Sequence, residues 1–193
     1  MSFSGPRRMP ASVHGLCLTL GALAAGCIDA GDIDHDEAAT SSAIVLDLTA
    51  NYTIVGVQSD KCVGVIGGST TPVGLEIRAC AGAASQRFHP EAMGGGFFRL
   101  RNELSGLCID VSEISQADGA AIIQFACGTG QNQQWSFTDV ASGAERMTAR
   151  HSGKVLDVVG QAVADGTLVE QWSSNNGANQ QFRLVKALSA FAP

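Results

Sequence analysis

The sequence has few charged residues and no basic segment in its main part. Only 16% of its 193 residues are Asp, Glu, Lys or Arg, and the formal net charge is −6. Residues 50–193 carry 12 acidic and 10 basic side chains, which leaves this region nearly neutral. Proteins that bind nucleic acid gather Lys and Arg against the phosphates, so we expect no nucleic-acid partner.

The sequence also has no apolar run near its start that is long enough to cross a bilayer. The run from Leu16 to Gly26 has eleven residues, whereas a spanning helix needs about 20. Arg7 and Arg8 precede it and small residues end it, which is typical of an export signal over residues 1–27.

The end of this run, Leu23-Ala24-Ala25-Gly26-Cys27, resembles a bacterial lipobox. The resemblance implies cleavage before Cys27 and attachment of a lipid to its sulfur, which would be the only contact with a membrane. The alternative is an ordinary secretory signal cut nearby. Both place the mature chain outside the cytoplasm, either secreted or as an outer-membrane or cell-surface lipoprotein.

No metal-binding motif is complete, and we expect neither a metal nor another cofactor. Asp32, Asp34 and Asp36 begin like a calcium loop, but Glu37 stands where the loop needs Gly and Ala43 stands where it needs a bidentate acid. We interpret residues 28–49, which hold six acids and no Lys or Arg, as an acidic flexible linker.

Catalytic motifs are missing as well. His151, Ser152 and Asp157 have the composition of a triad, but neighbouring residues at a strand end point to opposite faces. No nucleophile elbow is present, and the chain leaves no room for a separate catalytic domain. We therefore expect that the protein is not an enzyme.

What the sequence does contain is a motif that occurs three times. It reads Asn-Gln-Gln-Trp at 132–135, Asn-Gln-Gln-Phe at 179–182 and Ser-Gln-Arg-Phe at 85–88. The aromatic residues Phe88, Trp135 and Phe182 are 47 residues apart, and a constant period indicates an internal repeat. The repeats run over about 51–97, 98–145 and 146–188, followed by a tail at 189–193.

Each repeat is composed of short alternating segments, without a sustained helical period. Strands are expected at 53–55, 98–100, 155–158, 168–172 and 182–184. Asp118-Gly119 and Asp165-Gly166 occupy equivalent places between strands, where Gly suits the positive φ of a tight turn. These patterns predict an all-β domain with about four strands per repeat.

Cysteines stand at equivalent places in the first two repeats: Cys62 and Cys80, Cys108 and Cys127. The third repeat has Val155 and Ser174 at these places, so both partners are missing together. This predicts the bridges Cys62–Cys80 and Cys108–Cys127. Zinc binding is disfavoured because no C-x-x-C pair occurs and because an exported protein meets an oxidising environment.

Three all-β repeats of about 45 residues that close with Gln-x-Trp resemble the ricin-type β-trefoil lectin family. The resemblance covers residues 50–188 and implies a pseudo-threefold symmetric β-trefoil, a six-stranded barrel capped by three hairpins. It also implies that the domain binds carbohydrate. In the family, each site is formed by an Asp two residues after the first Cys, an aromatic residue two before the second Cys, and the Asn and Gln of the closing motif.

These positions are filled in two of the three repeats. The third repeat has all four residues: Asp157, Trp172, Asn179 and Gln180. The second repeat has a Phe as its aromatic residue: Asp110, Phe125, Asn132 and Gln133. An aromatic ring stacks on the apolar face of a sugar, while a carboxylate and an amide hydrogen-bond its hydroxyls. The first repeat has Gly64, Arg78 and Ser85 instead, and we expect it to bind no sugar.

Structural roles are an alternative for several of these residues. Asp110 and Asp157 would then bond turn backbone, and Phe125 and Trp172 would belong to the core. Gln86, like the equivalent Gln of the other repeats, persists where the rest of the site is lost, which favours a structural role for all three. We interpret the aromatic residues at 88, 135 and 182 as core.

We therefore expect a monomeric carbohydrate-binding lectin domain, with galactose- or xylan-type glycans as ligands of the second and third repeats. The rival hypothesis is a protein-interaction module with the same fold, such as a protease inhibitor or an adhesin, in which an exposed loop would bind and the site residues would be dispensable.

Overall fold

The computed structural model describes residues 44–141 and 143–187. The predicted export signal, Cys27, most of the predicted linker and the predicted tail lie outside these residues. Within them the structure has twelve β-strands and six short 3-10 helices, and no α-helix. The all-β prediction is confirmed. In this part of the chain no helix is long and apolar enough to cross a membrane.

Each predicted repeat contributes four strands, and the predicted strand segments all lie within them. The first repeat holds β1 (Tyr52–Gly56), β2 (Cys62–Val65), β3 (Val73–Arg78) and β4 (Phe88–Gly94). The second holds β5 (Phe97–Asn102), β6 (Cys108–Val111), β7 (Ala120–Phe125) and β8 (Trp135–Ala141). The third holds β9 (Ala144–Ala149), β10 (Val155–Val158), β11 (Thr167–Trp172) and β12 (Phe182–Lys186).

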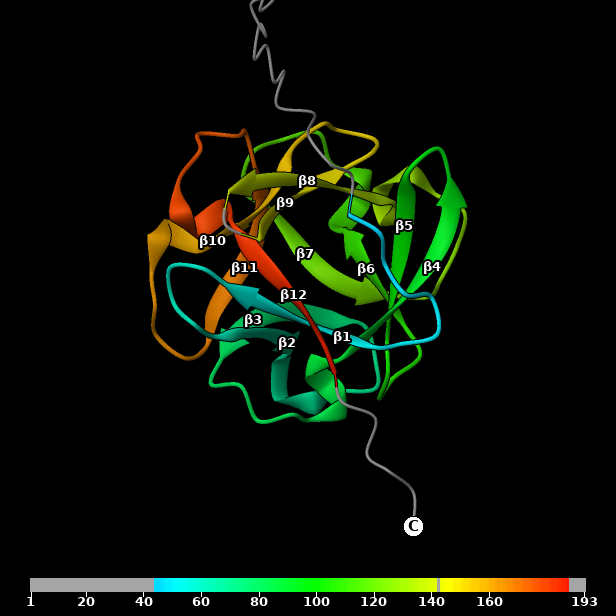
Figure 1. The fold of residues 1–193 in the computed structure, drawn as a ribbon, viewed down its shortest axis with the longest axis horizontal. Coiled ribbons are helices and arrows are strands. Elements are labelled where there is room, and N and C mark those ends of the chain that lie inside the picture. The colour runs from blue at the N-terminus through cyan, green and yellow to red at the C-terminus, as the bar shows by residue number, and fades with distance from the viewer. Residues whose placement is uncertain (1–43, 142, 188–193) are drawn as a thin grey trace, which may run out of the picture. The chain divides into compact units, whose positions relative to one another are not determined.

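The first and fourth strands of the repeats close into a six-stranded antiparallel barrel. Its order is β1–β4–β5–β8–β9–β12, and β12 pairs with β1 to complete the ring. Figure 1 looks into this barrel, with the pairs β1–β12, β4–β5 and β8–β9 around its centre. A closed ring leaves none of these strands as a free edge.

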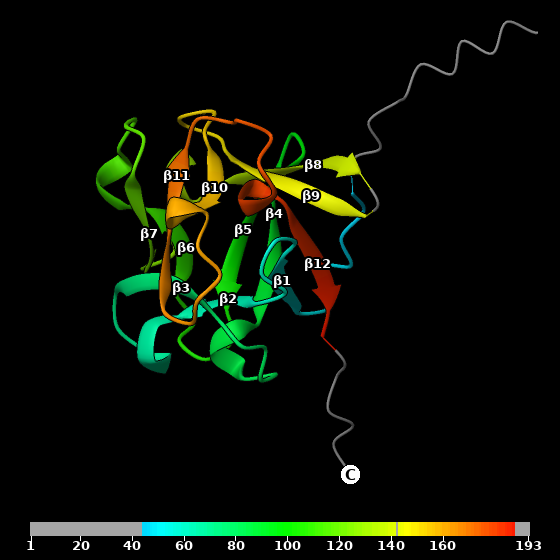
Figure 2. The same cartoon turned by 90° about the vertical axis from the view of Figure 1, so that its left-hand side faces the viewer.

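The second and third strands of each repeat form a hairpin: β2–β3, β6–β7 and β10–β11. The hairpins also pair with one another, since β3 contacts β7, β7 contacts β11 and β11 contacts β3. Figure 2 shows them gathered at one side of the barrel. A six-stranded barrel capped by three hairpins is consistent with the predicted β-trefoil.

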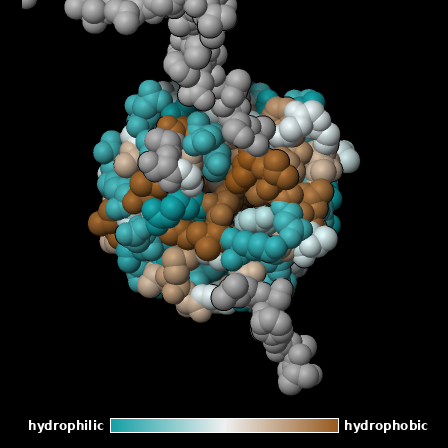
Figure 3. Space-filling model, in the orientation of Figure 1, coloured by the Kyte–Doolittle hydropathy of each residue, from teal (hydrophilic) through white to brown (hydrophobic). Residues whose placement is uncertain are grey.

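The core lies where the repeats meet. Phe88, Trp135 and Phe182 each begin a fourth strand and expose 0% of their surface, which confirms their assignment to the core. Apolar residues also reach the surface, and Figure 3 shows them gathered near the centre of one face with hydrophilic residues on either side. The repeat period therefore marks buried rings that belong to one hydrophobic core.

The aspartates of the Asp-Gly turns form side-chain bonds between neighbouring repeats. Gly119 and Gly166 have φ of +82° and +84°, as the turns predicted. Asp118 of the second repeat accepts a bond from Lys154 Nζ of the third, 2.6 Å from Oδ1. Asp165 of the third repeat accepts the equivalent bond from Lys61 of the first repeat at 2.5 Å. The aspartates thus clamp neighbouring repeats together, a role that the turn motif alone did not indicate.

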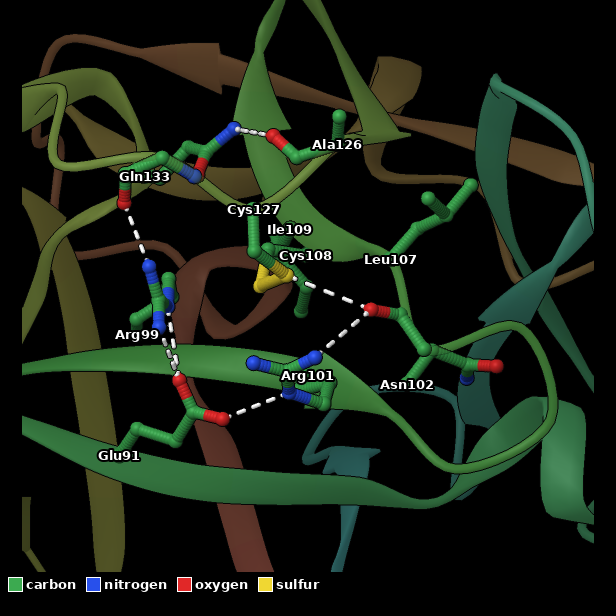
Figure 4. Close-up of a disulfide and its surroundings, with 12 residues drawn as sticks. Glu91, Arg99, Arg101, Asn102, Leu107, Cys108, Ile109, Ala126, Cys127 and Gln133 are labelled. Atoms are coloured by element: carbon green, nitrogen blue, oxygen red, sulfur yellow. Dashed lines mark hydrogen bonds and ion pairs between the residues drawn. A yellow bond between two sulfur atoms is a disulfide. The ribbon is translucent and has the colours of Figure 1, made fainter.

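Both predicted disulfides are present. Each bridge joins the first residue of a hairpin, Cys62 or Cys108, to a cysteine just after the second strand, Cys80 or Cys127, with Cα–Cα distances of 5.0 and 5.1 Å. Figure 4 shows the second bridge beside an ion-pair cluster in which Arg101 Nε donates to Glu91 at 2.6 Å.

The packed residues begin earlier than predicted. The flexible linker was expected to extend to residue 49, but Leu46 exposes only 8% of its surface and belongs to the core, and Ile44 packs against that core. The end of the predicted linker is therefore part of the folded domain, because an apolar side chain gains free energy when it leaves water.

Candidate functional site

Strand alternation in β11 presents the site of the third repeat. Val169 and Gln171 point inward and are buried, while Glu170 and Trp172 point outward. Trp172 exposes 40% of its surface, so it is not a core residue. Together with Asp157 and Asn179 from the neighbouring segments, these outward residues line a cavity of about 310 Å³. The structure brings together the residues that the sequence selected in this repeat.

The carboxylate of Asp157 is held from one side. Asn179 Nδ2 and Gln180 Nε2 both donate to its Oδ2, at 2.9 and 2.7 Å. No described residue donates a hydrogen bond to Oδ1. One carboxylate oxygen is therefore fixed by the protein, and the other is the natural acceptor for a ligand hydroxyl.

The same residues also satisfy the backbone beneath the cavity. Gln180 Nε2 donates to the carbonyl of Ser173 at 3.1 Å, and its Oε1 accepts from the Asn175 amide at 2.9 Å. Asn179 Nδ2 also reaches the Val158 carbonyl at 3.4 Å. Gln180 has the structural role that its persistence predicted, and it orients Asp157 in addition.

The second repeat reproduces this arrangement. Asn132 Nδ2 and Gln133 Nε2 donate to Asp110 Oδ2 at 2.9 and 2.7 Å. Phe125 points outward from β7 and exposes 48% of its surface, so it too lies outside the core. These residues line a cavity of about 490 Å³.

The barrel buttresses the second site. Gly128 N donates to Gln133 Oε1 at 2.7 Å, and Gly128 O accepts from Arg99 Nη1 at 2.6 Å. Arg99 is itself paired with Glu91 across the β4–β5 hairpin, within the cluster of Figure 4.

The first repeat keeps the scaffold and loses the site. Gln86 bonds the backbone of Ala79 and Ala81 at 3.0 and 2.9 Å, as its equivalents do in the other repeats. Gly64 replaces the Asp, and a Cβ added there would lie 2.9 Å from Gln86 Cγ. The glutamine occupies the space that the carboxylate would need. The pocket here is only about 180 Å³.

Burial raises the pKa of both site aspartates. The loss of hydration raises the pKa of Asp157, while the amide donors of Gln180 and Asn179 lower it in part. Burial raises the pKa of Asp110 in the same way, against the donors Gln133 and Asn132. Glu170 faces the same cavity as Asp157, and burial followed by repulsion from Asp157 and Asp118 raises its pKa.

Two glycines of the site were not selected by the sequence reasoning. Cβ atoms added at Gly130 and Gly177 would lie 2.5 Å from Oδ1 of Asn132 and Asn179. The first repeat has Ala83 at this place, together with Ser85 in place of the Asn. An alignment of the repeats carries this signal, because Gly occurs wherever the Asn two residues later is kept.

His151 and Ser152 do not form a catalytic pair. His151 Nε2 lies 2.9 Å from the Ser115 carbonyl, and the Ser152 hydroxyl donates to Gln171 Oε1 at 2.8 Å. The third member of the considered triad, Asp157, is bonded to the amides described above. Among residues 44–141 and 143–187, no cluster of three or more His, Cys, Asp or Glu residues has a geometry that would hold a metal.

The profile of the family described as the ricin-type beta-trefoil lectin domain matches residues 50–182. The chain belongs to this family. The matched residues run from just before β1 to the start of β12, so they include parts of all three repeats. No curated protein sequence matches the chain.

Solved structures agree with membership in the ricin-type lectin family. The designed threefold-symmetric protein ThreeFoil is 37% identical, with a TM-score of 0.69 over 70% of this chain and 97% of its own. An exo-beta-1,3-galactanase from Clostridium thermocellum is 34% identical, with a TM-score of 0.70 over 74% of this chain. The match covers 31% of the galactanase, so this chain corresponds to about a third of that enzyme.

The Macrolepiota procera ricin B-like lectin, solved in complex with lactose, has a TM-score of 0.65 over 74% of this chain and 99% of its own. At 19% identity, this likeness shows the fold alone.

Proposed function

We propose that this ricin-type lectin domain binds glycans through the cavities of the second and third repeats. The observation that carries the proposal is the arrangement at Asp157 and Asp110, where two amides hold one carboxylate oxygen beside an outward aromatic ring. A ring to stack on and an oriented carboxylate are the two features that a sugar needs. The arrangement supports binding.

Galactose-containing glycans are the first class to test, with xylan-type glycans as the second. The family match, the galactanase at 34% identity and the lactose complex of a fold relative support this order. A single open site of this kind is expected to bind with a Kd of about 1 mM, or about −4 kcal/mol. Two sites on one polymeric glycan increase the avidity if the glycan spans them.

Tryptophan fluorescence tests the site of the third repeat directly. Trp135 is buried, so Trp172 is the exposed tryptophan of the described residues and reports on this cavity. We expect galactosides to change the emission, and Asp157→Ala, which keeps the reporter, to abolish the change. Leu168→Ala is the matched control, because Leu168 also points outward from β11 but does not line the cavity.

Calorimetry with the same sugars tests the second repeat. In protein that already carries Asp157→Ala, the added substitution Phe125→Ala should remove the binding that remains. A titration signal that persists in this double variant would contradict the proposed sites. Absence of binding across a broad glycan panel would favour the protein-interaction alternative.

We further propose export, with lipid attachment at Cys27 as described for the lipobox. Mass spectrometry of the mature protein tests this. A chain that begins at Cys27 and carries acyl groups is expected, and an unmodified Cys27 or a cut elsewhere would rule out the anchor.

A further inference from the structure

The cavities of the second and third repeats share their polar base but differ in their walls. The residue paired in register with the site aspartate is Glu170 in the third repeat and Ile123 in the second. The second cavity is also larger, about 490 Å³ against about 310 Å³. A hydrogen-bonding wall in one repeat is therefore replaced by an apolar wall in the other.

Ile114 adds to this apolar wall from an unusual backbone position. It ends the 3-10 helix η3 (Ser112–Ile114) with φ of +54°, in the left-handed region that a β-branched residue rarely adopts. The equivalent residues of the other repeats are Gly68 and Gln161, which have similar φ values of +62° and +57°. The backbone of this turn is thus common to the repeats, and the β-branched side chain is peculiar to the second.

Packing does not account for Ile114. The side chain exposes 62% of its surface and lines the cavity together with Ile123 and Phe125. A strained residue that gains little from burial in the free protein points to a role at the site. A ligand in the cavity would cover the three apolar side chains and remove them from water.

The charged groups of the cavity limit what the ligand carries. Asp110 at the base and Glu113 at the rim are its ionisable side chains, and both are acids. An anionic substituent would be repelled, whereas a neutral apolar group fits against Ile114 and Ile123. The aromatic ring of Phe125 remains available for the sugar face.

We propose that the second repeat binds a sugar that carries a neutral apolar substituent, acyl or aryl, beside the hydroxyl held by Asp110. This rests on the proposed carbohydrate-binding function and assigns a different ligand class to each site. The third repeat, with Glu170 and Gln161 in its walls, takes an unsubstituted, hydroxyl-rich sugar.

The test compares substituted and plain sugars on protein in which Trp172→Ala has silenced the third site. The probe pairs are N-acetylgalactosamine with galactose for the acyl group, and phenyl with methyl β-galactoside for the aryl group. Covering roughly 50 Å² of apolar surface corresponds to about tenfold tighter binding of the substituted sugar. Calorimetry or NMR titration measures the ratio of the two Kd values within each pair, and we expect the tenfold preference in at least one pair.

Ile114→Gly is the deciding variant, because glycine adopts the left-handed conformation without strain. We expect it to keep or raise the thermal midpoint and to reduce the tenfold preference for the substituted sugar to about twofold or less. Val185→Thr is the control, because Val185 is an exposed β-branched residue on β12 that lines none of the three cavities. It should leave the preference unchanged.

The outcomes separate this inference from the proposed function. A second site that binds both members of each pair equally, or keeps its preference in Ile114→Gly, overturns the inference alone. Loss of all binding in Trp172→Ala also overturns it and leaves a lectin with one site. If the wild-type protein binds none of these sugars, the proposed function itself is overturned.

Discussion

At the scale of single residues, the site depends on amides that serve two purposes. Gln133 and Gln180 satisfy backbone groups and hold the site aspartates in place, while Gln86 does only the first. The asparagines add a second donor to the same carboxylate oxygen. Ligand binding and folding therefore share the same hydrogen bonds.

The raised pKa of Asp157 gives sugar binding a pH dependence. A protonated carboxyl loses its charge-assisted bonds to hydroxyls, so affinity at the third site should fall as the pH drops through this pKa. Because burial raises the pKa above the ordinary value of 3.8, the loss should begin at a higher pH than for an exposed Asp. Titration of Trp172 fluorescence with galactose between pH 7 and pH 4 measures it.

Asp157→Asn provides the comparison for this pH series. The amide does not titrate, so the pH dependence of its weaker binding should shrink to the part that comes from Glu170, which faces the same cavity. The raised pKa also means that ionising Asp157 costs folding free energy as the pH rises from 3.8 through that pKa, the reverse of its effect on binding. A wild-type affinity that stays constant to pH 4 would contradict the role given to the carboxylate.

Gly130 is required by the space around Asn132 rather than by its backbone angles. Its φ of −62° suits any residue, but a Cβ would lie 2.5 Å from Asn132 Oδ1. We expect Gly130→Ala to lower the free energy of unfolding by about 1–2 kcal/mol, as overpacking does. Urea denaturation measures the change.

Gly128→Ala in the same loop is the control. A Cβ there meets its nearest atoms at 3.9 Å, an ordinary contact, so stability should change little. Equal effects of the two substitutions would show that the loop, and not the asparagine, determines the cost.

At the scale of elements, the hairpins carry the sites and the bonds between repeats. Gln124 on β7 donates to the carbonyls of Ser69 and Thr71, and Gln171 on β11 donates to those of Ser115 and Ala117. The second and third hairpins are thus each bonded to a loop of the preceding repeat. In the first repeat, the position equivalent to these glutamines is Ile77, which has no side-chain amide.

The disulfides stabilise two of the three hairpins. Cys108–Cys127 closes a loop with a sequence separation of 19 and Cys62–Cys80 one of 18. Replacing both cysteines of either bridge by Ser should lower the free energy of unfolding by about 3 kcal/mol in the chain-entropy model. Urea unfolding of the oxidised variants measures this, with dithiothreitol-reduced wild type expected below both. A loss well under 1 kcal/mol would mean that the hairpins are held mainly by their neighbours.

Many features of the strands and hairpins could be predicted from the sequence. The bridges followed from paired cysteines that disappear together in the third repeat, and the strands followed from local alternation. The outward direction of Trp172 and Phe125 did not, because alternation gives the period of a strand but not which side faces the core. The clamps from Asp118 and Asp165 were also missed, since a turn motif does not name a partner in the next repeat.

At the scale of the whole domain, no repeat is complete without the others. The barrel closes only when β12 pairs with β1, and every hairpin pairs with the two others. The buried rings of the three repeats belong to one hydrophobic core. Stability is therefore a property of the assembled domain rather than the sum of three units.

Unfolding should accordingly be a single cooperative transition. In Trp172→Ala, the fluorescence of Trp135 reports on the core, while far-UV circular dichroism reports on the strands of all repeats. We expect the two urea curves to coincide. Separate midpoints would indicate that a repeat unfolds independently.

The repeats along the sequence indicated the period, the core rings and the disulfides, because these features recur at fixed spacings. The eight side chains proposed to bind sugar came from the resemblance to the lectin family, applied to the same repeats. Only the tertiary structure decided that the aromatic residues face solvent, that Gly130 and Gly177 make room for the asparagines, and that Ile114 stands strained in the wall of one cavity. The physical reason is that these properties depend on atoms brought together by closure of the barrel and its hairpins, which the spacing along the chain does not encode.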